Sequence, residues 1–299
     1  MTAKTEFDTE ILRRIENGED YAFPGELWKE KSCAILWKGY DFKKPYLDST
    51  AQEILKYFNQ SVLQQINGEK YREFTKGTFF SCGSSARLAM YSFTQLEDLS
   101  KKVRKNIDYI KIDGIGHTII SEIEKALPIY NTTHQYITNA NLDVVLKYED
   151  KDIYFIEVKC HEIFDSHRLE FSNKYSEILK KKFEIDITER KIQYKDFRIE
   201  KFKRFDFKQL ICHLYGISQY DYPGIKHLIY MFYFPKEWQN GKFAKVFKEL
   251  NEELVRVKEF VNNYYPNIEF GYFFAERFNT ILEINQQNHS CLHYPTNDI

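Results

Sequence analysis

Two acidic residues and a lysine stand where two apolar segments can bring them together. Asp143 lies in residues 142–148 (LDVVLKY), and Glu157 and Lys159 end residues 152–159 (DIYFIEVK). Both segments are rich in β-branched and aromatic residues, and three polar residues join them. The sequence therefore predicts an antiparallel hairpin that carries all three charged side chains.

The spacing of these residues predicts one shared site. With the turn centred on Asp150, residue 143 faces residue 157, and the Cβ atoms of opposed residues lie about 5 Å apart. Glu157 and Lys159 are two residues apart and so share a face of the strand. Two opposed carboxylates repel each other unless a divalent cation lies between them, and their hard oxygens suit Mg²⁺ or Mn²⁺.

This trio suits phosphodiester hydrolysis. Two acids hold a metal ion, and the Lys159 ammonium orients or helps to deprotonate a metal-bound water and offsets charge on the phosphate. An exposed strand with Glu and Lys two apart is the simpler interpretation of the triplet alone, and Asp143 after Asn141 could mark a strand entry. The apolar neighbours of both acids favour the site.

The pattern of an acid, a hairpin and E-x-K resembles the PD-(D/E)XK, or restriction-endonuclease-like, superfamily. Here Asp143 is followed by thirteen residues and then by Glu157-Val158-Lys159, and Leu142 stands where the superfamily name has Pro. The run from Ser84-Ser85 to Glu162 is similar to a bacterial group described as restriction endonucleases. The resemblance covers roughly residues 80–235.

The resemblance implies an α/β fold: a restriction-endonuclease-like core, with a mixed central sheet in αβββαβ order, flanked by extra helices. It also implies that Mg²⁺ (or Mn²⁺) is the cofactor and that the carbonyl of Val158 is a further metal ligand. Gln209 matches a place where members often have a polar residue facing the site. The implied catalytic residues are Glu124 (with Glu122 as reserve), Asp143, Glu157 and Lys159, of which the three acids hold the metal.

Periodicity and capping residues predict the surrounding elements. Residues 1–75 are expected to form a mainly helical N-terminal extension and residues 76–299 the nuclease-like domain, with one continuous globular unit as the alternative. The expected helices cover residues 54–66, a segment opening at Ser84-Ser85, 117–127 closed by Pro128, 180–208, 205–215 ended by Gly216, and 243–261. The further expected strands are residues 227–234 and 268–274.

Charge is unevenly distributed along the chain. The net charge is −1, but residues 180–208 contain eleven Lys/Arg and six Asp/Glu. A solvated helical face is the simpler interpretation of such a run. The alternative is a strip that neutralises phosphates, for which Lys201, Lys203, Arg204 and Gln209 are the candidate nucleic-acid-binding residues.

The favoured function is Mg²⁺-dependent cleavage of DNA in restriction or defence, by a cytoplasmic protein with no membrane span. The resemblance also allows a homodimer and a separate methyltransferase as partner. Three alternatives stay open: a repair, nicking or RNA-directed nuclease of the same fold; a non-catalytic nucleic-acid-binding module; and an unrelated α/β protein with a chance match. The five scattered cysteines form no CxxC pair, so buried thiols are favoured over a zinc site at the Cys-His pairs.

Overall fold

The protein has a mixed α/β fold around a five-stranded mixed sheet. The structure is a computed structural model that describes residues 3–17, 19, 84–86, 88–89, 119–130, 133–148, 152–164, 193–194, 197–198 and 202–276. The helices among these residues are α1 (Ala3–Glu16), the 3₁₀ helix η2 (His161–Phe164), α9 (Phe207–Gln219), α10 (Lys236–Gln239) and α11 (Ala244–Tyr264). The strands are β1 (Ile119–Tyr130), β2 (Tyr136–Tyr148), β3 (Ile153–Lys159), β4 (Gln193–Tyr194), β5 (Phe197–Arg198), β6 (Lys226–Tyr233) and β7 (Ile268–Ala275).

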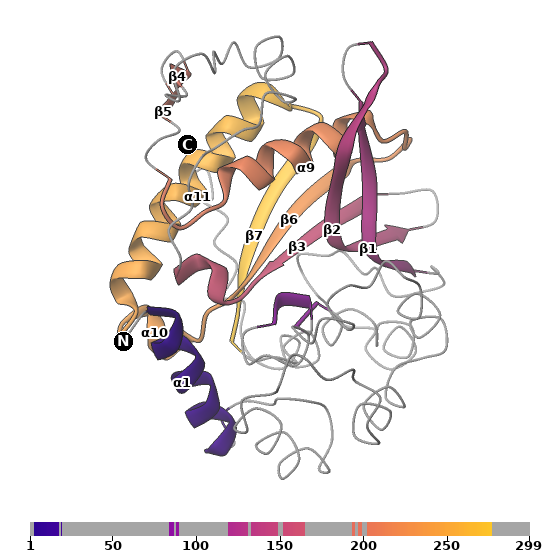
Figure 1. Cartoon of the computed structure of the whole chain (residues 1–299). Helices are drawn as coiled ribbons and strands as arrows, with labels where there is room; N and C mark the ends of the chain where they lie inside the picture. The colour runs from indigo at the N-terminus through magenta and orange to yellow at the C-terminus, as the bar shows by residue number, and fades with distance from the viewer. Residues whose placement is uncertain are drawn as a thin grey trace, which may run out of the picture.

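The main sheet has the strand order β1-β2-β3-β6-β7 (Figure 1). The pairs β1–β2 and β2–β3 are antiparallel, whereas β3–β6 and β6–β7 are parallel. Parallel neighbours need a crossover connection, and the chain passes through α9 before β6 and through α11 before β7. Figure 1 shows α9 and α11 on the same side of the sheet, where the rings of Phe207 and Phe260 lie 4.9 Å apart.

The centre of the sheet is the most deeply buried part of the described chain. Six of the seven residues of β3 are buried, and the last six residues of β6 are buried as well. A parallel strand covered on both faces carries apolar residues without alternation, which explains the runs IYFI in β3 and LIYMFY in β6. Any charged residue placed in this part of the sheet must therefore find a partner inside the protein.

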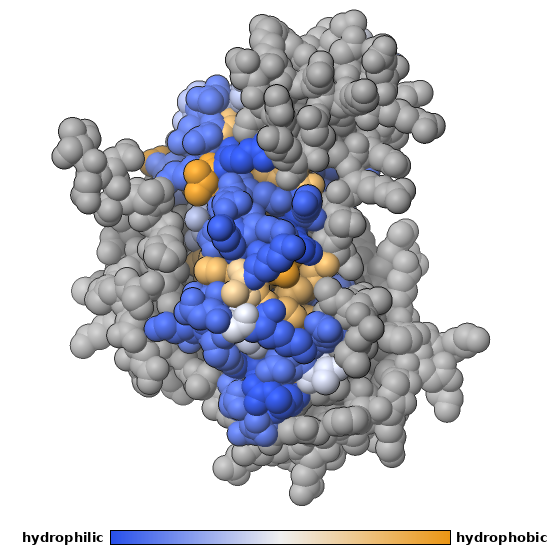
Figure 2. All heavy atoms as spheres, turned by 90° about the vertical axis from the view of Figure 1, so that its left-hand side faces the viewer, coloured by the Kyte–Doolittle hydropathy of each residue, from blue (hydrophilic) through white to orange (hydrophobic). Residues whose placement is uncertain are grey.

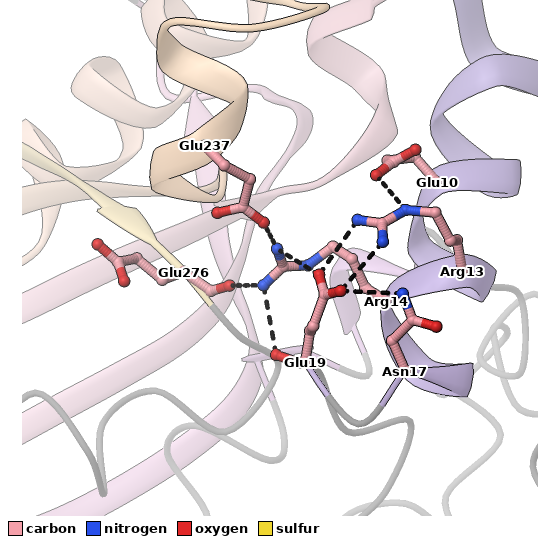
Figure 3. A network of polar contacts seen from close by, with 7 residues as sticks. All are labelled: Glu10, Arg13, Arg14, Asn17, Glu19, Glu237 and Glu276. Atoms are coloured by element: carbon pink, nitrogen blue, oxygen red, sulfur yellow. Dashed lines mark hydrogen bonds and ion pairs between the residues drawn. The ribbon is translucent and has the colours of Figure 1, made fainter.

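Helix α1, at the beginning of the chain, packs against η2 and α10, which lie much later in the chain. Phe7 contacts the rings of Phe164 and Trp238, with centroids 4.9 and 5.4 Å away. The buried guanidinium of Arg14 forms an ion pair with Glu237 and donates to the carbonyl of Glu276 at 3.1 Å (Figure 3). Figure 2 shows a mainly hydrophilic described surface over this side of the molecule, with a small apolar area at its centre.

The expected helix over residues 117–127 is wrong, because all of its described residues, 119–127, belong to strand β1. Its apolar residues do recur at helical spacing, but thirteen-residue β2 offers pairing along almost the whole segment, and that tertiary partner overrides the local pattern. Pro128 does not close a helix; it lies within β1 opposite Asn139. Proline is tolerated there because β1 is an edge strand of the sheet.

The expected stop at Gly216 is also wrong, because α9 continues through it to Gln219. A Cβ at Gly216 would lie 2.9 Å from the Cβ of Ala140 and 3.2 Å from that of Leu127. The missing side chain therefore lets α9 approach the β1–β2 hairpin closely. In this case glycine marks a helix–sheet contact rather than a helix end.

The described residues of the basic segment that precede α9 are not helical. Strands β4 and β5 form a small antiparallel pair, and residues 202–206 precede α9 in an irregular conformation. The predicted helix of residues 54–66 lies outside the described residues, as do all of residues 20–75.

The remaining expected elements are confirmed to within a few residues. They are the hairpin of β2 and β3, strands β6 and β7, and helix α11. Of the helix expected to open at Ser84-Ser85, only the first residues are described; they are helical, and the Leu88 N–H donates to the Ser84 carbonyl. None of the described helices is both long enough and apolar enough to cross a membrane.

Candidate functional site

The site lies where β2 and β3 separate. The ladder ends at the pair of Val144 and Ile156, and in each of its pairs the two residues are equally far along the chain from Asp150. The predicted register is therefore confirmed, and continuing it by one residue brings Asp143 opposite Glu157. Beyond this ladder a side chain, and not the backbone of β2, accepts the next hydrogen bond of β3: the Val158 N–H donates to Asp143 Oδ2 at 2.7 Å.

Glu157 is a nearly buried carboxylate held by two donors. The residue is 4% exposed, and its Oε1 accepts from Gln209 Nε2 at 2.7 Å and from Lys159 Nζ at 2.6 Å. Gln209 lies in the first turn of α9, where Asp206 caps the helix by accepting from the Gln209 N–H at 3.0 Å. The cap fixes the start of the helix and so aims the Gln209 amide at the site.

Lys159 is the cation of this cluster, with a side chain only 13% exposed. Burial lowers the pKa of its ammonium, but the carboxylates of Glu157, Glu162 and Asp143 raise it more, so that the pKa lies above its usual range. Lys159 is therefore protonated at neutral pH. In this arrangement it acts as a fixed positive charge and hydrogen-bond donor rather than as a base.

Glu162 joins the site from η2, just after β3. Its carboxylate accepts from the Cys160 N–H at 2.7 Å, which ties the start of η2 to the end of the strand. The carboxylate is close enough to raise the pKa of Lys159. Glu162 follows Lys159 by three residues, and these contacts place its carboxylate beside the site.

The backbone of Glu124, on β1, lies in line with Asp143 across the sheet. The pairs on either side of it, Ile123 with Val144 and Lys125 with Leu142, put its backbone opposite that of Asp143. The register thus aligns Glu124, Asp143 and Glu157 across three neighbouring strands, although Glu124 lies on a strand and not on the expected helix. The reserve candidate, Glu122, forms ion pairs with Lys125 and Lys147.

Two buried residues complete the site and were missed from the sequence. His213 lies one turn after Gln209 in α9, and its Nε2 is 2.9 Å from the Asn141 carbonyl and 3.7 Å from Glu157 Oε2. Its Nδ1 is 3.0 Å from the hydroxyl of Tyr230, which lies beside Glu157 in the parallel ladder. The spacing of Gln209 and His213, four residues apart on a helix, was the available signal.

The ionisation of these two residues follows from their burial. Burial lowers the pKa of His213 and the charge of Lys159 lowers it further, outweighing the opposite effect of Glu157. Burial also raises the pKa of Tyr230 well above its usual value, as do the carboxylates of Glu157 and Asp206. Both side chains are therefore neutral at neutral pH.

The four candidate nucleic-acid-binding residues lie in different surroundings. Lys203 is exposed, and Gln209 faces the site as expected, whereas Lys201 lies outside the described residues. The side chain of Arg204 is engaged inside the protein, because its Nε donates to Glu249 at 2.8 Å and Nη1 donates to the Phe164 carbonyl at 3.3 Å. These contacts give Arg204 a packing role.

The donor chemistry of this site fits a hard divalent cation. Asp143 and Glu157 present carboxylate oxygens from opposed positions, and oxygen ligands are those that Mg²⁺ and Mn²⁺ prefer. The carbonyl of Val158 points to the same strand edge as its N–H, toward Asp143. Among the side chains that the structure describes, which do not include that of Glu124, no group of three metal-ligating residues converges.

The chain matches no protein-family model, and no curated protein or solved structure is significantly similar to it.

Proposed function

We propose that this protein is a metal-dependent nuclease that hydrolyses phosphodiester bonds of DNA. One observation carries the proposal: a buried carboxylate, an opposed carboxylate and a protonated lysine meet at the fork between β2 and β3. The Glu157–Lys159 contact of 2.6 Å and the Asp143–Val158 contact of 2.7 Å hold these groups in place. Charged groups are kept this deep in a sheet at a cost to stability, and such groups commonly serve a function.

In this proposal Asp143 and Glu157, with Glu124 from β1, would hold Mg²⁺ or Mn²⁺, together with the carbonyl of Val158. A bound divalent ion supplies positive charge for a phosphate oxygen and lowers the pKa of a bound water. Gln209 fixes the Glu157 carboxylate by donating to Oε1. Lys159 presents its ammonium to the phosphate, where negative charge develops as the bond breaks.

The order of elements supports a restriction-endonuclease-like core. Among the described residues, helical residues after Ser84 precede β1, β2 and β3, and α9 and β6 follow after η2, β4 and β5, an order compatible with αβββαβ. Substrate DNA, a role in restriction or defence, a homodimer and a separate methyltransferase partner belong to the same proposal and derive from the resemblance of the motif.

Cleavage of supercoiled plasmid DNA tests the proposal. We expect nicked or linear product with Mg²⁺ or Mn²⁺, and none with EDTA or with Asp143→Asn. The matched control is Asp152→Asn, which changes an acid at the other end of the same hairpin and should leave cleavage intact.

Cleavage that persists in EDTA would contradict metal dependence. DNA binding without cleavage by the parent protein under all metal conditions would favour a non-catalytic binding module, and cleavage of RNA alone would favour an RNA-directed nuclease.

A further inference from the structure

A hydrogen-bonded chain connects β2, which carries Asp143, with β6, the neighbour of the strand β3 that carries Glu157. It runs from the Asn141 carbonyl through the His213 ring to the hydroxyl of Tyr230, with contacts of 2.9 and 3.0 Å. Asn141 lies two residues before Asp143 on β2, and Tyr230 pairs with Glu157 across β3 and β6. One ring of α9 thus contacts the neighbours of both acids.

The direction of each hydrogen bond follows from the chemistry of its partners. A carbonyl oxygen only accepts, so Nε2 of His213 must carry a proton and donate to Asn141. Because the ring is neutral, Nδ1 has no proton and accepts from the Tyr230 hydroxyl. Both ring nitrogens are hydrogen-bonded, and the ring therefore holds β2 and β6 at a fixed separation.

The same ring also limits where Glu157 can lie. His213 Nε2 is 3.7 Å from Glu157 Oε2, while Gln209, one turn earlier on α9, donates to Oε1 at 2.7 Å. His213 is 1% exposed, so no water can replace it without opening the core. Removing the ring would leave the buried Tyr230 hydroxyl without this partner and would release the Asn141 carbonyl from α9, which favours movement of the β2 end.

We propose that His213 is a positioning residue that sets the separation of the Asp143 and Glu157 carboxylates, and thereby the affinity of the site for its divalent cation. This inference rests on the proposed function, because it takes both carboxylates as metal ligands. His213 itself is not a ligand: its two nitrogens are used by Asn141 and Tyr230. Groups that orient ligands in this way typically change metal affinity by about 10- to 100-fold when they are removed.

Titration of the full chain with Mn²⁺, followed by the loss of the free-ion signal in electron paramagnetic resonance, tests the proposal without any substrate. We expect His213→Leu to weaken Mn²⁺ binding by about tenfold or more. His213→Gln should recover most of the affinity, because its amide can donate to Asn141 and accept from Tyr230. His227→Gln is the matched control: it replaces a largely buried histidine elsewhere on the sheet and should leave affinity unchanged.

Tyr230→Phe is the second variant, in case His213→Leu does not fold. It removes one hydroxyl and leaves the ring, and it should weaken Mn²⁺ binding by less than His213→Leu does. Parent-like affinity in both Tyr230→Phe and a folded His213→Leu would overturn the positioning role, and so would equal losses in His227→Gln. If the parent cleaves DNA with Mg²⁺ but the His213 variants bind Mn²⁺ as the parent does, the positioning role fails while the proposed nuclease function stands. A parent that neither binds Mn²⁺ nor cleaves DNA overturns both.

Discussion

The two ends of β3 and β6 each hold a nitrogen-bearing side chain among carboxylates, in opposite surroundings. At the carboxyl end, the ammonium of Lys159 lies among the carboxylates of Glu157, Asp143 and Glu162, with side-chain exposures of 13% for Lys159 and 5% for Glu157. At the amino end, the imidazole of His227 lies between Asp152 and Glu269, at 3.3 and 3.1 Å. There the two carboxylates are 33% and 63% exposed.

The solvent makes the difference between these clusters. An open groove of about 670 Å³ is lined by Asp152 and Glu269, so water screens the charges at the amino end. Side chains of α9 contact Glu157 and Tyr230 at the carboxyl end, where each charge depends on its protein partners. The contrast indicates which cluster a change of charge will disturb and which will tolerate it.

The largest effect is expected from Lys159→Met. This change removes the cation from a buried group of carboxylates and should lower the free energy of unfolding by about 3–5 kcal/mol, as for other broken buried pairs. Added Mg²⁺ should restore part of the loss, because a divalent ion can replace the missing positive charge. Urea unfolding with and without Mg²⁺ measures both, with exposed Lys248→Met on α11 as control; equal stability of the two variants would contradict the comparison.

A smaller effect is expected from Gly216→Ala, which tests whether the close approach of α9 maintains the buried end. The new Cβ meets Ala140 at 2.9 Å, and these groups must move apart, at an expected cost of about 1–3 kcal/mol. Thermal unfolding measures this cost. The exposed position Ser218→Ala in the same helix is the control, and a Gly216→Ala protein as stable as the parent would show that the helix can shift freely.

The pH dependence of stability should also distinguish the buried end. The pKa of folded His213 is lowered by burial and by Lys159, against Glu157 and Asp206, so the folded state resists protonation of the ring. Its stabilising effect is therefore present above the ordinary pKa of about 6.5 and is lost as pH falls below it.

His213→Gln removes this titration. The difference in unfolding free energy between parent and variant should change by at most about 1.4 kcal/mol per pH unit between pH 7 and 5, with the parent losing more. Parallel curves over that range would show that the ring takes up a proton in the folded state as easily as in the unfolded chain.

The smallest effect is expected from Glu269→Gln at the exposed end. Its carboxylate is 63% exposed, and exposed ion pairs contribute less than about 1 kcal/mol, a contribution that salt reduces further. Chemical unfolding at low and high salt should show near-parental stability. A loss as large as that of Lys159→Met would mean that water does not screen this groove.

The sequence alone determined the elements whose signal is local. The turn residues around Asp150 and the apolar runs on both sides specified the hairpin and its register, so Asp143, Glu157 and Lys159 were predicted at one site before any tertiary contact was known. Strands β6 and β7 and helix α11 also followed from their own periodicity.

Only the tertiary structure decided the features that depend on a distant partner. Residues 119–130 became a strand because β2 offered a full set of backbone partners, against their helical spacing. The role of Gly216 depends on its close contact with Ala140 and Leu127 on the hairpin, and the role of Arg204 depends on its ion pair with Glu249. His213 looks like an ordinary core residue in the sequence, and only the packing of α9 brings it between Asn141 and Tyr230. Such contacts join residues tens of positions apart, and no local pattern encodes which of them will meet.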